Sequence, residues 1–348
     1  MATKDINVGV IGASGYTGSD LIRMLSGHPK INLKYVSANN HAGQRINEIY
    51  PYLNGKVDLL LEKWEDINWS GVDVIFSCLP HGIFHKIFQE LPAEKIIIDL
   101  SADFRLSSSK DYAQWYNFEH KSIKSINQFV YGLTELNRSK IRKSKMVACP
   151  GCYPTATLLA LYPLIAEDLI DLNHISIDAK SGVSGAGRTP KRDLMFSEIS
   201  ESFRPYSVTG HRHIVEIEQQ LMFHSKNDIK INFIPHLVPM NRGELVTSHV
   251  RVNRDIELNE IIEIYQSKYR DDNFINIMSN GNVPNTINVR GTNNCDIALI
   301  PGRVEQTLII ISAIDNLVKG SSGQAIQNMN LIHGWPEELG LGQISIFP

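Results

Sequence analysis

The sequence predicts an α/β protein, in which a doubly wound parallel sheet is followed by an α+β domain with a mixed or antiparallel sheet. Three observations support this fold class. Short apolar runs without polar alternation alternate with stretches of helical periodicity in the first 150 residues. A glycine-rich turn joins the first apolar run to the first helical stretch. Beyond residue 150 the strand patterns become longer, which is typical of mixed or antiparallel sheets.

The first strand is expected at 6–11 (INVGVI), an apolar run suited to burial on both faces of a parallel sheet. The turn GASGYTG follows directly and opens a helical pattern, so it has the strand–turn–helix context of a Rossmann-type dinucleotide site. Glycine permits close approach of the backbone to a pyrophosphate, and the helix N-terminus offers N–H groups to it. A glycine turn without a ligand is the alternative. We expect the cofactor to contact Gly12, Ser14, Gly15, Tyr16, Thr17 and Gly18.

The second strand, at 32–37 (NLKYVS), bears on the choice of cofactor. An NAD site usually places an acidic residue after this strand to bind the ribose 2′-hydroxyl. Here Ser37 is followed by Ala-Asn-Asn, and Arg45 lies a few residues further on. A carboxylate would repel a 2′-phosphate, whereas Ser37 and Arg45 suit one, so the pattern favours NADP. Arg45 as a solvated surface charge is the alternative.

The alternation of strands and helices continues, with strands expected at 57–61, 73–78 and 95–100 and a helix at 83–91. Ligands of doubly wound sheets bind beyond the carboxyl ends of the strands. Ser77 and Pro80 follow one such end and are expected to contact the cofactor. Arg105 follows the next one, and its guanidinium suits a substrate carboxylate or phosphate.

A C-x-x-C pair, Cys149 and Cys152, lies between a short apolar run at 146–149 and a helix expected to begin near Pro154 or Thr155. Cys152 would therefore stand just before a helix N-terminus, where the dipole favours a thiolate, while Cys149 would be buried. A redox dithiol is expected in the first βαβ unit of its fold, not after a complete nucleotide-binding domain. A zinc site would need two further ligands, and His211-x-His213 lacks the usual spacing, so no metal is expected. We favour Cys152 as a nucleophile that attacks an acyl carbon beside a nicotinamide cofactor.

The second half contains a strand that leads into a glycine-rich loop at 174–187. Ser181 and Arg188 could present donors to the substrate, and Gly185 and Gly187 to the cofactor, although a flexible loop is the alternative. Further elements are expected as strands at 230–239, 244–252, 296–302 and 307–314 and as a helix at 256–269. Together they indicate an α+β substrate domain with a face for a second subunit.

Two histidines precede or open a helix that begins near residue 213. His211 and His213 would point about 200° apart on a helix, so they cannot share one role. We select His211 as the acid/base group and keep His213 as the second choice; both could instead be interface or capping residues.

The bulk composition excludes several classes of protein. The 348 residues are 43% hydrophobic and 20% charged with a net charge of -3, which gives no argument for nucleic acid or an anionic membrane. No apolar run approaches the ~20 residues that span a bilayer, and no secretory signal core opens the chain. Four cysteines make no disulfide scaffold. We expect a cytoplasmic protein.

The stretch VACPGCYPTATLLALYP at 147–163 resembles the active-site signature of the N-acetyl-gamma-glutamyl-phosphate reductase family. The blocks GASGYTG, LPHG, DLSADFR, SGVSGAGR, HRHIVEIEQ and GQAIQNMNL follow the family's order along nearly the whole chain. The resemblance implies an NADPH-dependent reductive dephosphorylation of N-acetyl-gamma-glutamyl phosphate through a cysteine thioester, in arginine biosynthesis. It assigns the nucleophile to Cys152 and the acid/base role to His211.

The resemblance also implies the domain plan and the assembly. An NADP-binding domain at 1–150 would be completed by a C-terminal helix within about 315–348, and a catalytic and oligomerisation domain would occupy 151–314 of a homodimer or homotetramer. Two alternatives remain. A lysine-pathway homologue would reduce an aminoadipyl phosphate, and a non-catalytic NADP-binding regulator would keep the glycine turn without needing a thiolate.

Overall fold

The computed structural model describes residues 6–225, 227–279 and 281–346. These residues form two compact units, one comprising the chain up to Pro150 with Ser321–Gly342, the other Gly151–Gly320 with the residues from Gln343 onward. Within the described residues, no helix is long and apolar enough to cross a membrane.

The first unit is built on a seven-stranded sheet in which every pairing is parallel, with the order β3-β2-β1-β4-β5-β7-β6. The central strands are mostly apolar and largely buried, as expected for a sheet covered on both faces. The strand order reverses at β1, which lies between β2 and β4 and defines the switch point of a doubly wound sheet. The strands are β1 (Ile6–Ile11), β2 (Ile31–Ser37), β3 (Leu61–Glu62), β4 (Val74–Ser77), β5 (Ile96–Asp99), β6 (Val130–Tyr131) and β7 (Met146–Ala148). The predicted parallel, Rossmann-type sheet is thus confirmed.

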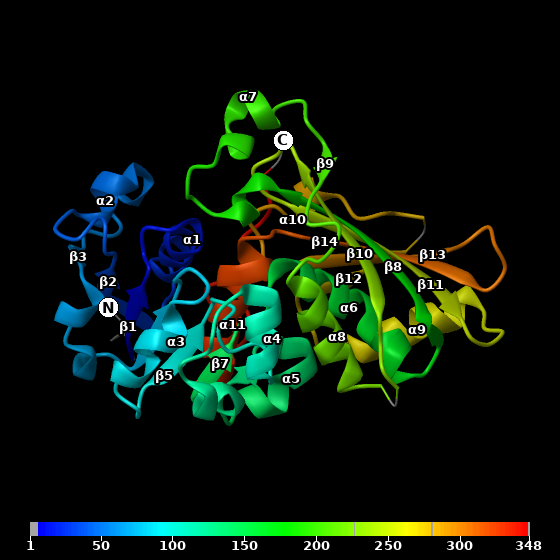
Figure 1. The fold of residues 1–348 in the computed structure, drawn as a ribbon, viewed down its shortest axis with the longest axis horizontal. Helices are drawn as coiled ribbons and strands as arrows, with labels where there is room; N and C mark the ends of the chain where they lie inside the picture. Colours follow the sequence, from blue (N-terminus) through cyan, green and yellow to red (C-terminus); the bar gives the residue numbers. More distant parts are fainter. Residues whose placement is uncertain (1–5, 226, 280, 347–348) are drawn as a thin grey trace. The chain divides into compact units, whose positions relative to one another are not determined.

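Helices connect these strands and cover the sheet (Figure 1). The helices are α1 (Tyr16–Leu25), α2 (Ile46–Ile49), α3 (Phe84–Ile87), α4 (Ser109–Tyr116), α5 (Thr134–Ile141) and α11 (Gly323–Ile332). Two expectations need correction. The strand expected at 57–61 is only the two-residue β3, and the helix expected at 83–91 is the single turn α3 followed by a 3₁₀ turn at Phe88–Glu90. Both stretches are too short to show a reliable period in the sequence.

The second unit contains a seven-stranded mixed sheet with the order β12-β13-β14-β11-β8-β10-β9. The β8–β10 and β12–β13 pairings are parallel and the others are antiparallel, which confirms the predicted mixed sheet. The strands are β8 (Ile170–Gly182), β9 (Arg204–Pro205), β10 (Ile231–Val238), β11 (Glu244–Val252), β12 (Ile275–Ile277), β13 (Cys295–Pro301) and β14 (Thr307–Ile314).

Three helices pack along one face of this second sheet, namely α6 (Cys152–Ala166), α8 (His213–Met222) and α9 (Leu258–Lys268) (Figure 1). Two single turns, α7 (Phe196–Ile199) and α10 (Thr286–Val289), lie in connecting segments. Every residue of α6 from Tyr153 to Ile165 is buried, because the helix is apolar on all sides. The helix begins at Cys152, two residues earlier than the sequence suggested. Pro154 did not mark the first helical residue, since proline fits anywhere in a first turn, where N–H groups lack intrahelical partners.

Candidate active site

The glycine turn of the first unit has no room for side chains at two of its three glycines. Gly12 has a φ of +83°, and a Cβ there would lie 2.6 Å from the Cys78 carbonyl oxygen. A Cβ at Gly18 would lie 2.4 Å from the Gly12 oxygen. At Gly15, by contrast, the nearest atom to a Cβ would be 3.7 Å away, and no side chain caps the helix that Gly15 opens. The turn therefore leaves the N-terminus of α1 open to an anion, which fits the pyrophosphate of a dinucleotide.

The other predicted residues of this turn lie around the same helix start. The Ser14 carbonyl accepts a hydrogen bond from the Tyr50 hydroxyl (2.8 Å), and Tyr16 is partly exposed. Thr17 is half-buried in the first turn of α1.

Two predicted cofactor contacts lie at the end of β4. Ser77 is fully buried, and its hydroxyl has no hydrogen-bond partner among the described residues. A buried hydroxyl without a partner is costly, so this oxygen is suited to a polar group of a ligand. Pro80 follows in the exposed segment after the strand.

The residues after β2 contain no carboxylate until Glu48. Ser37 is buried at the strand end, where its carbonyl accepts hydrogen bonds from the N–H groups of Gly12 (3.1 Å) and Ala13 (2.8 Å). Arg45 is exposed and forms an ion pair with Asp58 (2.8 Å). An exposed pair of this kind is weak, so a phosphate could compete for the guanidinium. The role of Arg45 toward a 2′-phosphate stays a prediction.

Arg105 is buried, and two of its donors bind backbone carbonyls. Its Nε donates to the Cys149 carbonyl (2.7 Å) and its Nη2 to the Leu100 carbonyl (3.1 Å). The guanidinium thereby fixes the backbone that leads to Cys152. Its predicted contact with a substrate anion stays a prediction.

The two cysteines of the C-x-x-C pair have different environments. Cys149 is fully buried, and burial raises the pKa of its thiol to about 12. Cys152 is half-buried and is the first residue of α6. All four cysteines of the chain are within the described residues, and none forms a disulfide. A thiol that stays protonated is a poor nucleophile, so the structure favours Cys152 over Cys149 for acyl transfer.

The backbone around Cys152 is held from both sides. The N–H of Gly151, the N-cap residue of α6, donates to Glu216 Oε1 of α8 (2.8 Å). The Thr155 hydroxyl donates to the Gly151 carbonyl (2.9 Å). A Cβ at Gly320 would lie 2.7 Å from the Cys152 Cβ, so only glycine fits beside the cysteine.

His211 lies just before α8 and is buried in an aromatic environment. Its ring centroid is 5.7 Å from that of Tyr153 and 5.5 Å from that of Tyr206. Tyr153 follows Cys152 directly, and the Tyr206 hydroxyl donates to the Tyr153 hydroxyl (3.3 Å), so the aromatic rings around His211 begin next to Cys152. Burial, and next the Arg212 guanidinium, lower the pKa of His211 to about 3.

A backbone contact determines which nitrogen of His211 carries the proton. The His213 N–H donates to His211 Nδ1 (3.1 Å), so the neutral ring is protonated on Nε2. His211 therefore faces its surroundings as a hydrogen-bond donor. His213 itself is the first residue of α8, as the sequence predicted.

The predicted anion-binding loop begins at the end of β8. Ser181 is buried, and its hydroxyl donates to the Gly182 carbonyl (3.1 Å). A Cβ at Gly185 would approach the Ser181 hydroxyl to 3.3 Å, and Gly187 has a φ of +81° with open space around it. Arg188 is exposed. The roles of these residues toward substrate and cofactor stay predictions.

Sequence reasoning missed one buried acid in this region. Glu244, the first residue of β11, is 0% exposed. Burial raises the pKa of its carboxyl to about 8, with Asp315 adding to the rise and a hydrogen bond from Cys152 opposing it. A signal was available, because Glu244 alternates with Val246, Ser248 and Val250, which are all buried on one face of β11. An acid in register with the buried face of a strand is unusual enough to mark a site.

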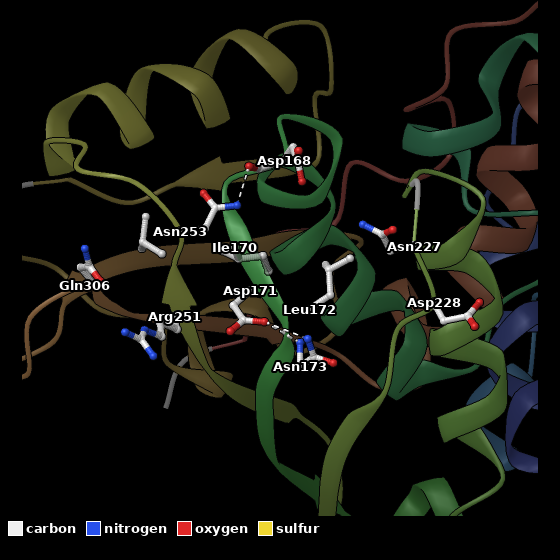
Figure 2. A pocket seen from close by; sticks show the side chains of 11 residues that line it. Asp168, Ile170, Asp171, Leu172, Asn173, Asn227, Asp228, Arg251, Asn253 and Gln306 are labelled. Atoms are coloured by element: carbon white, nitrogen blue, oxygen red, sulfur yellow. Dashed lines mark hydrogen bonds between the residues drawn. The ribbon is translucent and has the colours of Figure 1, made fainter.

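A separate hollow of about 520 Å³ lies where β8 begins and β11 ends, at the opposite ends of these strands from Ser181 and Glu244 (Figure 2). It contains none of the predicted site residues. Its lining is mostly polar and includes Asp168, Asp171, Asn173, Asp228, Arg251 and Asn253. Across the described residues, no group of three or more His, Cys, Asp or Glu side chains is arranged to hold a metal ion.

Two family models match the chain. The semialdehyde dehydrogenase NAD binding domain matches residues 7–144, and the semialdehyde dehydrogenase dimerisation domain matches residues 152–316. The chain is 45% identical to N-acetyl-gamma-glutamyl-phosphate reductase of Halothermothrix orenii over 99% of this chain and 100% of that protein. It is 44% identical to the probable chloroplastic N-acetyl-gamma-glutamyl-phosphate reductase of Arabidopsis thaliana, over 99% of this chain and 86% of that protein.

Solved structures share the fold at much lower identity. Aspartate semialdehyde dehydrogenase II of Vibrio cholerae, complexed with ASA, matches with a TM-score of 0.74 at 17% identity, over 95% of this chain and 99% of that one. Aspartate semialdehyde dehydrogenase with NADP from Candida albicans matches with a TM-score of 0.71 at 15% identity, over 94% and 98% of the two chains.

Proposed function

Because the chain belongs to the N-acetyl-gamma-glutamyl-phosphate reductase family, we propose that it reduces N-acetyl-gamma-glutamyl phosphate to N-acetylglutamate 5-semialdehyde in arginine biosynthesis. The reaction uses NADPH and releases phosphate. The observation that carries the proposal is the half-buried Cys152 at the start of α6, next to a Cys149 whose thiol stays protonated. The relatives support the substrate, since the identity extends over 99% of the chain.

The residues of the second unit suit acyl transfer. Cys152 attacks the acyl carbon as a thiolate, favoured by the N-terminal dipole of α6, and phosphate leaves from the resulting thioester. NADPH, when bound, supplies the hydride that reduces this thioester. His211 donates from Nε2 to the oxygen on which negative charge develops, and a neutral donor in a buried site is effective there.

The residues of the first unit suit the cofactor. The open N-terminus of α1 would bind the pyrophosphate, and the Ser77 hydroxyl would find a partner in the ligand. Ser37 and Arg45 would bind the 2′-phosphate, because no carboxylate stands between Ser37 and Glu48 to repel it.

Arg105, Ser181 and Arg188 are the groups that we assign to the anionic ends of the substrate. The main alternative substrate is an aminoadipyl phosphate, as in the lysine-pathway homologue. One extra methylene discriminates only ~10- to 200-fold in a pocket, so both substrates need to be assayed.

We also assign a homodimer or homotetramer to the working protein. The matched dimerisation domain supports this assignment, and so does the sheet face opposite α6, α8 and α9. That face carries half-buried apolar side chains, which are typical of a surface that a second subunit covers: Ile234, Leu245, Ile309 and Ile311. Sedimentation of the purified protein distinguishes dimer from tetramer.

Reverse turnover tests the proposed function. N-acetylglutamate semialdehyde, NADP and phosphate should yield NADPH at a rate that depends on phosphate. Cys152→Ala should abolish this rate, whereas Cys149→Ala should keep substantial turnover. If both variants are equally inactive, a dithiol mechanism replaces the single nucleophile. A protein that binds NADP but shows neither turnover nor fast alkylation of Cys152 would instead be a regulator.

A further inference from the structure

Acyl transfer from a thiol needs a group that holds a proton while the sulfur is ionised. His211 is poorly prepared for this, since its Nδ1 already accepts the His213 N–H and its Nε2 carries a proton. To take a proton from Cys152, the ring would have to give up that backbone contact and become charged in a buried site. Burial opposes the charge, as the lowered pKa of His211 shows. A second proton-holding group near Cys152 would let the sulfur ionise while the His211 ring stays neutral.

Glu244 meets the geometric requirements for this group. It begins β11, where the register pairs it with Ser181 on β8 and Ile314 on β14. It lies on the sheet face covered by α6, the helix that starts at Cys152. Its side chain is fully buried, and neither carboxyl oxygen has a hydrogen-bond partner of ordinary geometry among the described residues. Cys152 lies near this carboxyl: a Cβ at Gly320 would meet both the Cys152 Cβ (2.7 Å) and Ile314 Cδ1 (3.3 Å), and Ile314 is the β14 partner of Glu244.

The charged and titratable groups that face Glu244 come from several elements. Cys152 and Tyr153 lie on α6, Tyr206 lies just after β9, and Asp315 lies just after β14. Arg242 is next to Asp315 and pairs with it (3.5 Å). Asp315 also accepts the N–H groups of Leu317 (2.8 Å), Val318 (3.1 Å) and Gly291 (2.6 Å). Asp315 is thus surrounded by hydrogen-bond donors, whereas Glu244 has no such donors within the described part of the chain.

From this arrangement, and resting on the proposed acyl transfer, we propose that Cys152 and Glu244 share one proton during the reaction. When Glu244 holds the proton, it is a carboxylic acid and the Cys152 sulfur is a thiolate. When Cys152 holds the proton, the sulfur is a thiol and Glu244 is a carboxylate. The raised pKa of Glu244, about 8, supports this exchange, because a proton carrier works best when its pKa is near the working pH.

The proton and electron balance is complete without another reactant. The sulfur loses its proton to the carboxylate and forms a bond to the acyl carbon, and the C–O bond to phosphate breaks with its electron pair on the phosphate. The departing phosphate takes one proton from solvent. Hydride addition to the thioester leaves the thiohemiacetal as its alkoxide. The C=O bond then re-forms while the C–S bond breaks with its electron pair on sulfur, and Glu244 returns its proton to the thiolate. Glu244 ends the cycle as it began.

The alternative is that Glu244 is a buried acid with no part in the chemistry. Two measurements separate these roles, and neither needs the substrate. The first is the pH profile of Cys152 alkylation by iodoacetamide in the full-length protein and in Glu244→Gln. The second is the infrared carbonyl band of a protonated carboxylic acid in the wild-type protein, before and after alkylation of Cys152.

If the proton is shared, the wild-type alkylation profile shows two coupled ionisations and Glu244→Gln shows one. Alkylation of Cys152 then shifts the carboxylic acid band, and Glu244→Gln lacks the band. Reverse turnover of Glu244→Gln should fall by roughly 10²-fold. Glu218→Gln is the matched control, since Glu218 is a buried glutamate of the same unit that accepts from the Ile231 N–H (3.1 Å). Its alkylation profile should keep both ionisations.

Superposable profiles of wild type and Glu244→Gln would refute the proposal, as would a carboxylic acid band that ignores alkylation of Cys152. The infrared test uses the wild-type protein, so it remains decisive if the variant does not fold. If the two ionisations are present but N-acetylglutamate semialdehyde is not oxidised, the proton sharing stands and the proposed substrate is wrong.

Discussion

Replacing Glu244 by glutamine should change the stability of the protein in a pH-dependent way. The wild-type carboxyl has a pKa of about 8 in the folded protein, against an ordinary value of 4.5. Below pH 4.5 the carboxyl is protonated in both the folded and the unfolded chain, so it does not affect the pH dependence. Between these two values the unfolded chain releases the proton and the folded protein keeps it. Wild-type stability therefore falls as the pH rises through this window and reaches its full loss above the folded pKa.

The size of the effect follows from the difference between the two pKa values. About 3.5 pH units at about 1.4 kcal/mol per unit give at most about 5 kcal/mol of lost stability above pH 8. Glutamine does not titrate, so it removes this loss. Its amide must also be buried, at a cost that does not depend on pH. The free-energy difference between Glu244→Gln and wild type should thus shift in favour of the variant, by several kcal/mol, between about pH 5 and about pH 9.

Urea unfolding of both proteins at fixed protein concentration measures this difference. The concentration must be fixed because subunit association contributes to stability. Unfolding is followed by far-UV circular dichroism, which needs no label on a cysteine. A difference between the two proteins that stays constant over the pH range would refute the reasoning, because Glu244 would then have the same pKa in the folded and unfolded chains.

Three further predictions concern the site residues. His211→Asn should lower kcat by ~10² to 10⁴-fold with little change in NADPH affinity, as measured by steady-state kinetics and by cofactor titration. NADPH should be preferred over NADH in kcat/KM, and Arg45→Ala should reduce this preference; equal kcat/KM for the two cofactors would contradict the assignment. Gly18→Ala should weaken NADPH binding at least roughly tenfold, because its Cβ would lie 2.4 Å from the Gly12 oxygen and displace the pyrophosphate-binding turn. Gly27→Ala, where the nearest atom would be 3.7 Å away, is the control.

The sequence predicts the first sheet well because parallel strands are buried on both faces. Val74, Ile75 and Phe76 are 0% exposed, and such a run is recognisable without any knowledge of its neighbours. Short edge elements carry no such signal. β3 has only two residues, so the period of its apolar residues cannot be measured, and the sequence overestimated its length.

The position of Cys152 was also predictable, because it depends on local features. Cys152 lies where a strand ends and a helix begins, and both boundaries leave marks in the sequence. The tautomer of His211 was not predictable. It depends on the backbone N–H of His213 approaching Nδ1, which is a matter of turn geometry and not of residue type.

The surroundings of the two acids near Cys152, Glu244 and Asp315, depend even more strongly on tertiary structure. Glu244 opens β11 and Asp315 follows β14, and both are fully buried. Asp315 accepts three N–H groups and faces Arg242, which suits a carboxylate. Among the residues that the structure describes, Glu244 has no comparable donors, so burial and the nearby Asp315 favour its protonated form. The two neighbouring carboxyls therefore have different surroundings: Asp315 is held by hydrogen-bond donors, and Glu244 is held by none among the described residues. A buried carboxyl near Cys152 whose pKa is raised to about 8 is placed to exchange a proton with the Cys152 sulfur, which is why we give Glu244 this role.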